Sequence, residues 1–260
     1  MSTFNIEEYL KSLPDDIEEI NINNRNLNYI PTLERFKRLK IFSCSFNLIT
    51  NLPDLPNTLI FLNCGYNQLT FLPRLPCALE HLYCSNNLLN SLPLLPLSLK
   101  VLYCSHNRLL SSLPNLSQNK LEKIYCYQNH LSNLPNLPNT LKELYCEYNQ
   151  LTILPDLPPT LEILSCFNNR LNTLPVLPKL LNKLYCIDND LPFITIKEWY
   201  KFNLFKNTYY KIKYGSRLER YYIKNIRNRD IHKEMKELIF CPDYNFYKRF
   251  LNPDIVNMFA

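Results

Sequence analysis

The sequence predicts a β-rich repeat solenoid, because one pattern returns about every twenty residues along most of the 260-residue chain. Eight of the ten cysteines follow one another at intervals of 20 residues, with a single interval of 22, at positions 44, 64, 84, 104, 126, 146, 166 and 186. The copies share the form L-x-x-L-x-C-x-x-N-x-L, with an occasional Phe or Ile in place of a leucine, and usually continue with two Leu-Pro pairs. Self-similarity at a fixed, short period is typical of solenoids, in which each copy forms one turn.

Each repeat is expected to form one short strand and one extended return segment. In L-x-x-L-x-C the second leucine and the cysteine fall on the same face, as a half-buried strand requires. Two prolines in the second half exclude a helix there and favour polyproline-like backbone. We therefore expect short parallel strands on a concave side and an extended convex side. The longer interval has extra residues between Leu109 and Leu121, which predict a convex bulge without loss of strand register.

The repeats resemble the leucine-rich repeat, L-x-x-L-x-L-x-x-N/C-x-L, over about residues 13–194, and they look closest to the short LPxLP subtype of bacterial effectors. Residues 17–27 form a degenerate first copy, so the solenoid is expected to have about nine repeats over residues 17–194. The departure from the family is the cysteine, because relatives usually have Leu, Val or Ile at that position. The resemblance implies a horseshoe-shaped solenoid.

The repeated cysteines are expected to be free, buried thiols in one inward-facing column. A free cysteine behaves as a small hydrophobic residue and is among the most buried residue types. Single cysteines in a straight column do not converge on a metal ion, so neither a metal nor a cofactor is predicted. Side chains on neighbouring parallel strands point the same way, which disfavours disulfide bonds.

The asparagine three residues after each cysteine is expected to be structural. Its amide donates and accepts hydrogen bonds, so it can satisfy backbone groups where strand pairing has stopped. This asparagine column comprises Asn47, Asn67, Asn87, Asn107, Asn129, Asn149, Asn169 and Asn189.

Three positions are expected on the concave surface: the residue before each cysteine, the residue two positions earlier and the residue just after the cysteine. The first of these is often a tyrosine. Rigid aromatic side chains with a polar tip are enriched in protein-binding surfaces. The candidate binding residues are Phe61, His81, Tyr83, Tyr103, Tyr125, Tyr127, Tyr145 and Tyr185. An alternative is that the tyrosines only stack on one another, or were copied together with the repeats.

The two ends differ from the repeats. Residues 1–16 are predicted to form a helical cap, with Asn5 as the helix N-cap of residues 5–12. Residues 195–260 are predicted to be a basic, aromatic helical region, in which Thr195 and Ser216 are candidate N-caps. The start of the chain has no signal-peptide pattern and no apolar run approaches eighteen residues, so we expect a cytoplasmic protein without a membrane span.

These features predict a non-enzymatic protein–protein interaction scaffold that binds a protein partner on its concave surface. No enzyme is expected, because a chain with two glycines cannot form a Gly-rich phosphate loop and the four histidines do not cluster with a carboxylate or a serine. One alternative is nucleic acid or another acidic surface, bound through the C-terminal region. By family analogy, a third is an adaptor or effector in ubiquitin signalling, although the 69 residues after Leu191 are too few for the ligase domain that some relatives carry.

Overall fold

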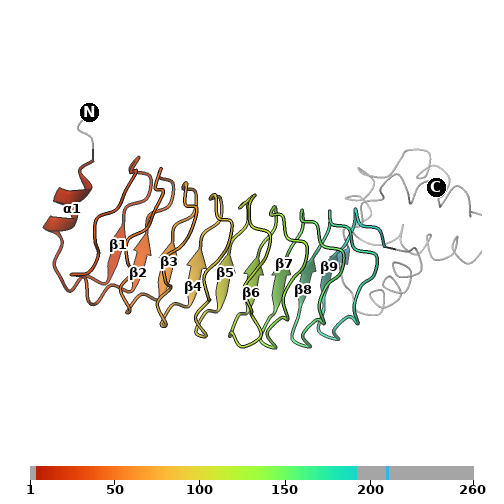
Figure 1. Ribbon diagram of the computed structural model, residues 1–260. Helices are drawn as coiled ribbons and strands as arrows, with labels where there is room; N and C mark the ends of the chain where they lie inside the picture. The colour runs from red at the N-terminus through yellow and green to blue at the C-terminus, as the bar shows by residue number, and fades with distance from the viewer. Residues whose placement is uncertain (1–3, 192–208, 211–260) are drawn as a thin grey trace, which may run out of the picture.

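Each copy of the repeat forms one turn of a parallel-strand solenoid, so the predicted fold class is confirmed (Figure 1). The computed structural model describes residues 4–191 and 209–210. Within these residues one helix precedes a ten-stranded sheet whose strands follow one another in chain order. The elements are α1 (Ile6–Ser12), β1 (Glu19–Asn21), β2 (Ile41–Ser43), β3 (Phe61–Asn63), β4 (His81–Tyr83), β5 (Val101–Tyr103), β6 (Lys123–Tyr125), β7 (Glu143–Tyr145), β8 (Ile163–Ser165), β9 (Lys183–Tyr185) and β10 (Tyr209–Tyr210).

Equivalent residues of successive turns lie side by side. Leu62 of β3 pairs with Leu82 of β4, and Tyr103 of β5 pairs with Tyr125 of β6 across the longer turn. The register is therefore kept at the 22-residue interval, as predicted. The turn accommodates its extra length by turning Leu109 outward, with 62% of its surface exposed, while Leu110 takes the buried position.

The core is a continuous stack of inward-facing leucines and cysteines. The middle residue of each strand from β1 to β9 is buried, and so is the cysteine that follows each strand from β2 to β9. Fully burying a leucine side chain contributes about 1.5–3 kcal/mol relative to leaving it in water. Because every turn repeats this burial against its two neighbours, the stack is stabilised along its whole length.

Helix α1 lies at the end of the row of strands, beyond β1 (Figure 1). Asn5 is its N-cap, and the Asn5 side chain accepts hydrogen bonds from the backbone N–H groups of Glu7 and Glu8. Ile6 and Leu10 of the helix are buried in the core. The helix thus covers apolar surface that the first turn would otherwise expose.

The sheet also extends beyond the repeats. Tyr209–Tyr210 form β10, which pairs in parallel with β9. A strand was not predicted in residues 195–260, which were expected to be helical. The free edge of β9 offers backbone donors and acceptors, and an added strand satisfies them. The predicted N-caps Thr195 and Ser216 lie outside the described residues.

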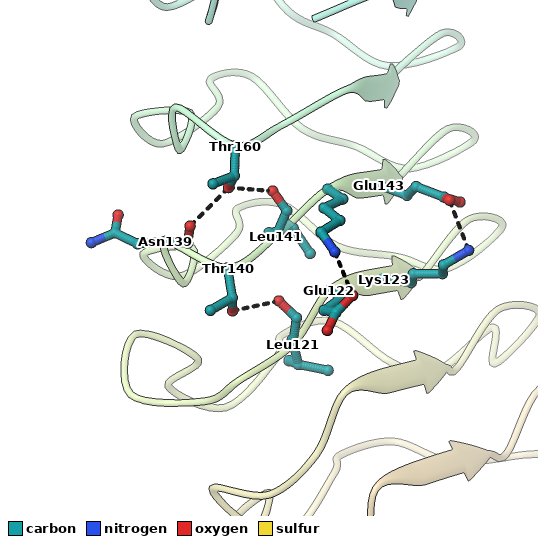
Figure 2. Close-up of polar contacts among 9 residues, drawn as sticks. Leu121, Glu122, Lys123, Asn139, Thr140, Leu141, Glu143 and Thr160 are labelled. Atoms are coloured by element: carbon teal, nitrogen blue, oxygen red, sulfur yellow. Dashed lines mark hydrogen bonds and ion pairs between the residues drawn. The ribbon is translucent and has the colours of Figure 1, made fainter. Parts of the chain in front are cut away.

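Hydroxyl groups join neighbouring turns on the approach to the strands (Figure 2). The Thr140 Oγ1 donates to the Leu121 carbonyl oxygen at 2.8 Å, and the Thr160 Oγ1 donates to the carbonyls of Leu141 and Asn139, also at 2.8 Å. Equivalent bonds link Thr58 to Leu39 and Ser98 to Leu79. These side chains satisfy carbonyl groups that lie before the strand ladder begins.

Charged side chains also follow the register of the turns. At the position after the first leucine of most repeats, lysine and glutamate alternate. They form the pairs Lys40–Glu18, Lys100–Glu80 and Lys142–Glu122 at 2.7–2.8 Å. These pairs are largely exposed, so each one adds little to stability. Their alternation prevents like charges from stacking between neighbouring turns, which would be unfavourable.

Candidate interaction surface

The outward-facing side of the sheet is the candidate interaction surface. We call it the strand face, and it consists of the first and third residues of each strand from β2 to β9 together with the residue that follows each column cysteine. The third positions of β4, β5, β6, β7 and β9 are partly exposed tyrosines. The predicted residues Phe61, His81 and Tyr127 lie on the same side and are also partly exposed.

The tyrosines of four consecutive strands form a stacked column. The ring centroids of Tyr83 and Tyr103 are 4.6 Å apart, those of Tyr103 and Tyr125 are 4.0 Å apart, and those of Tyr125 and Tyr145 are 4.6 Å apart. Phe61 continues the column with a tilted ring 5.2 Å from Tyr83. The tyrosines therefore do stack, as the alternative proposed, and they keep exposed area that a partner can contact.

The predicted residues Tyr185 and Tyr127 lie apart from this column. Buried Ser165 occupies the tyrosine position of β8 and interrupts the column between Tyr145 and Tyr185. Tyr127 belongs to the row of residues that follow the cysteines, and its ring meets His106 edge-on at 5.2 Å. His81 packs beside Phe61, with a centroid distance of 6.1 Å.

A polar network lies at the middle of the strand face. Figure 2 shows Lys123 of β6 next to Glu143 of β7, with Nζ and Oε1 2.8 Å apart. The Tyr125 hydroxyl donates to the other oxygen of Glu143, also at 2.8 Å. Burial opposes ionisation of Glu143, but the hydrogen bonds from Lys123 and Tyr125 outweigh it and lower the pKa of the carboxyl. Burial and the hydrogen-bonded surroundings raise the pKa of Tyr125, so its hydroxyl stays a donor.

Sequence reasoning missed a second set of exposed aromatic residues along the rim of the strand face. The residue before each column asparagine has a positive φ of 52–57°, a conformation that favours Gly, Asn or Asp. Phe46, Tyr66 and Tyr148 nevertheless occupy it and are about half exposed. The rings of Phe46 and Tyr66 stack 4.2 Å apart. The signal in the sequence is the aromatic residue directly before the asparagine in these repeats.

The asparagine column bonds to backbone in two turns at once. The Asn107 Nδ2 donates to the carbonyls of Cys84 at 3.1 Å and Cys104 at 3.0 Å, and its Oδ1 accepts from the Leu89 N–H at 3.1 Å. Asn149 repeats this arrangement with Cys126, Cys146 and Leu131. Each asparagine thus joins its own turn to the preceding one.

The cysteine column lies on the opposite, inward side of the turns. All eight thiols are free and buried. Burial raises the pKa of each thiol, to about 12 for Cys64 and Cys186, so the reactive thiolate is disfavoured. Within the described part of the chain, no group of three or more His, Cys, Asp or Glu side chains has the arrangement of a metal site.

Thiol labelling separates the column from the rest of the chain. In a Cys241→Ser background, which removes the cysteine outside the described residues, we expect one rapid modification in native buffer, at the exposed Cys77. The eight column thiols should react only after denaturation, because burial both blocks the reagent and suppresses ionisation. Mass spectrometry of the labelled peptides provides the measurement, and rapid native labelling of several column cysteines would contradict the expectation.

None of the helices in the described ranges is long and apolar enough to span a bilayer.

Comparisons with known proteins find a similar fold in leucine-rich repeat proteins. No family model and no curated protein matches the chain. Among solved structures it is similar to YopM, a leucine-rich effector protein from Yersinia pestis, with 36% identity and a TM-score of 0.60 over 67% of this chain and 52% of that one. It is also similar to a Shigella effector LRR domain, with 25% identity and a TM-score of 0.51 over 78% of this chain and 82% of that one. The chain spans about half the length of the YopM structure. Its repeats, its parallel strands in register and these likenesses together show that the chain is a leucine-rich repeat solenoid, similar in fold to these two effector proteins.

Proposed function

We propose that the chain is a non-enzymatic scaffold that binds a protein partner on its strand face. The observation that carries the proposal is the aromatic column of Phe61, Tyr83, Tyr103, Tyr125 and Tyr145, which stays partly exposed on the outward side of the sheet. Stacking alone does not require five rings on the solvent side. Tyrosine offers large contact area at a low cost in conformational entropy, which suits recognition.

The charge distribution supports a partner surface that is largely uncharged at its centre. Lys123 and Glu143 neutralise each other in the middle of the column, and Tyr125 completes the network. A partner that covers this network meets rings and satisfied polar groups. The centre of a protein interface is typically aromatic and depleted of unpaired charge, with polar groups at its rim.

The likeness to effector proteins supports the same class of function. YopM and the Shigella domain are leucine-rich repeat effectors by description, and this chain shares their fold. A rigid solenoid with an extended face is suited to contact another protein over many turns.

Paired variants of two tyrosines test the proposal. We expect Tyr103→Ala with Tyr125→Ala to abolish capture of the native partner, because hot spots at the centre of an interface each contribute about 2 kcal/mol or more. Tyr103→Phe with Tyr125→Phe keeps both rings and should retain most of the capture. Quantitative affinity capture after cross-linking in the native cell provides the measurement.

Two controls separate binding from folding. Removing the rings also removes ring contacts worth about 0.5–1.5 kcal/mol each, so urea unfolding must show that the alanine variant is folded under the capture conditions. Phe71→Ala removes a half-exposed aromatic residue outside the strand face and should capture normally. Equal capture by the folded alanine variant and the native chain would exclude the strand face as the binding site.

A further inference from the structure

Glu147 stands apart from the paired carboxylates of the solenoid. Glu18, Glu80, Glu122 and Glu143 each lie within 2.8 Å of a lysine Nζ. The Oε2 of Glu147 is buried, and no described residue forms a hydrogen bond with it. An ionised carboxylate oxygen that is buried without a partner is costly, because it loses its water and gains nothing in return.

Among the described residues, no positively charged side chain compensates the carboxyl of Glu147. The titratable groups that it influences on neighbouring turns are the strand-face residues Tyr127 and Tyr145 and, on the inward side, the thiols of Cys126 and Cys146. In the following turn the Ser165 hydroxyl bonds to its carboxyl, and the inward thiol of Cys166 is influenced by its charge. The nearby cations of the strand face are used elsewhere: Lys123 pairs with Glu143 at 2.8 Å, and the exposed Lys183 acts on Glu143 as well.

We propose that Glu147 makes the strand face around β7 a proton-dependent switch. The protonated carboxyl is uncharged and can keep the buried position of Oε2 that the structure shows. The ionised carboxylate favours a position in water, so it leaves this environment and loosens the packing of the turns at β6, β7 and β8. The device depends on side chains of the solenoid alone, so it stands whether or not the proposed partner binds there.

The titration has a definite sign. Burial raises the pKa of Glu147 above its ordinary value of 4.5, although its own backbone N–H and Ser165 oppose the shift. Below pH 4.5 the carboxyl is protonated in both the folded and the unfolded chain, so it has no cost. As pH rises through the raised folded pKa, the folded state loses this advantage and the solenoid becomes less stable. Glu143, whose pKa is lowered, acts in the opposite direction.

Comparison with a neutral variant isolates Glu147 from the other titrating groups. We expect the full chain and its Glu147→Gln variant to have equal unfolding equilibria near pH 4 in urea. Towards neutral pH, the variant should become the more stable one, by about tenfold in the equilibrium constant for each pH unit of the pKa shift. Glu162→Gln replaces an exposed glutamate and is the matched control, for which we expect no such gain in stability towards neutral pH.

Two further measurements keep the test decisive. Glu147→Ser is a second neutral variant, which guards against poor packing of the amide in Glu147→Gln. It introduces the residue found at the same position in the turns of Ser85 and Ser105, and it should show the same pH dependence of stability. Carboxyl carbon NMR should show Glu147 titrating above 4.5, with the ring signals of Tyr127 and Tyr145 following the same curve. A stability difference that does not vary with pH, or a Glu147 titration at or below 4.5, would overturn the proposal.

Discussion

Replacing Asn87 and Asn107 together with alanine is expected to destabilise the solenoid by more than the sum of the two single replacements. Each asparagine accepts one backbone N–H, that of Leu69 for Asn87 and that of Leu89 for Asn107. Each single variant therefore leaves one buried amide unpaired, at about 1–3 kcal/mol.

The excess in the double variant comes from a carbonyl group that the two side chains share. The Cys84 carbonyl oxygen accepts from the Asn87 Nδ2 at 3.2 Å and from the Asn107 Nδ2 at 3.1 Å. Each single variant leaves it one donor, and the double variant leaves it neither of them. We expect an additional loss of about 1–3 kcal/mol, which is the usual cost of a buried polar group without a partner.

A second double-mutant cycle provides the matched control. Asn107 and Asn149 have the same role in turns that do not touch, and they share no carbonyl group. Their effects on the free energy of unfolding should add within about 0.5 kcal/mol. Urea unfolding of the single and double variants measures both coupling energies. A negligible coupling between Asn87 and Asn107, or an equal coupling in the control pair, would show that the column does not act through shared carbonyls.

The sequence could predict the asparagine and cysteine columns because both follow from the period of the repeat. A strand residue that moves by one position changes to the opposite face, so only one register buries the second leucine and the cysteine together. The same register predicts that Tyr103 lies beside Tyr125. Parallel strands are about 4.8 Å apart, which is also a stacking distance, so a tyrosine at one position in successive turns must stack or rotate away.

Other features depend on competition among side chains that the pattern does not resolve. Lys123 interacts electrostatically with both Glu122 and Glu143, and it pairs with Glu143, whereas Glu122 pairs with Lys142. The Oε2 of Glu147 has no hydrogen-bond partner among the described residues. The sequence does not indicate the left-handed backbone at Phe46 and Tyr66, because aromatic residues rarely adopt this conformation. Strand β10 has two residues and no repeat pattern, so only the free edge of β9 could suggest it.

The last prediction concerns the junction between α1 and the solenoid, where Phe36 stands at the position that Pro56 occupies in the next turn. Phe36 is fully buried, and the Arg35 guanidinium lies over its ring at 4.6 Å. Arg35 in turn donates to the carbonyls of Leu10 and Leu13 at the end of α1, at 2.5 and 2.6 Å, and pairs with Asp15 at 2.9 Å. One ring therefore supports both the first turns of the core and the residue that holds the helix.

Phe36→Ala is accordingly expected to cost about 3–5 kcal/mol of local stability, as for other buried aromatic residues. Because each turn of a solenoid contacts only its neighbours, the loss should be confined to one end. Hydrogen exchange should show faster exchange in α1, β1 and β2 and unchanged protection from β5 to β8. Phe71→Ala, at a half-exposed ring, should alter neither region by more than about 0.5 kcal/mol. Equal loss of protection along all turns would mean that the solenoid unfolds as one unit and that Phe36 is not a local support.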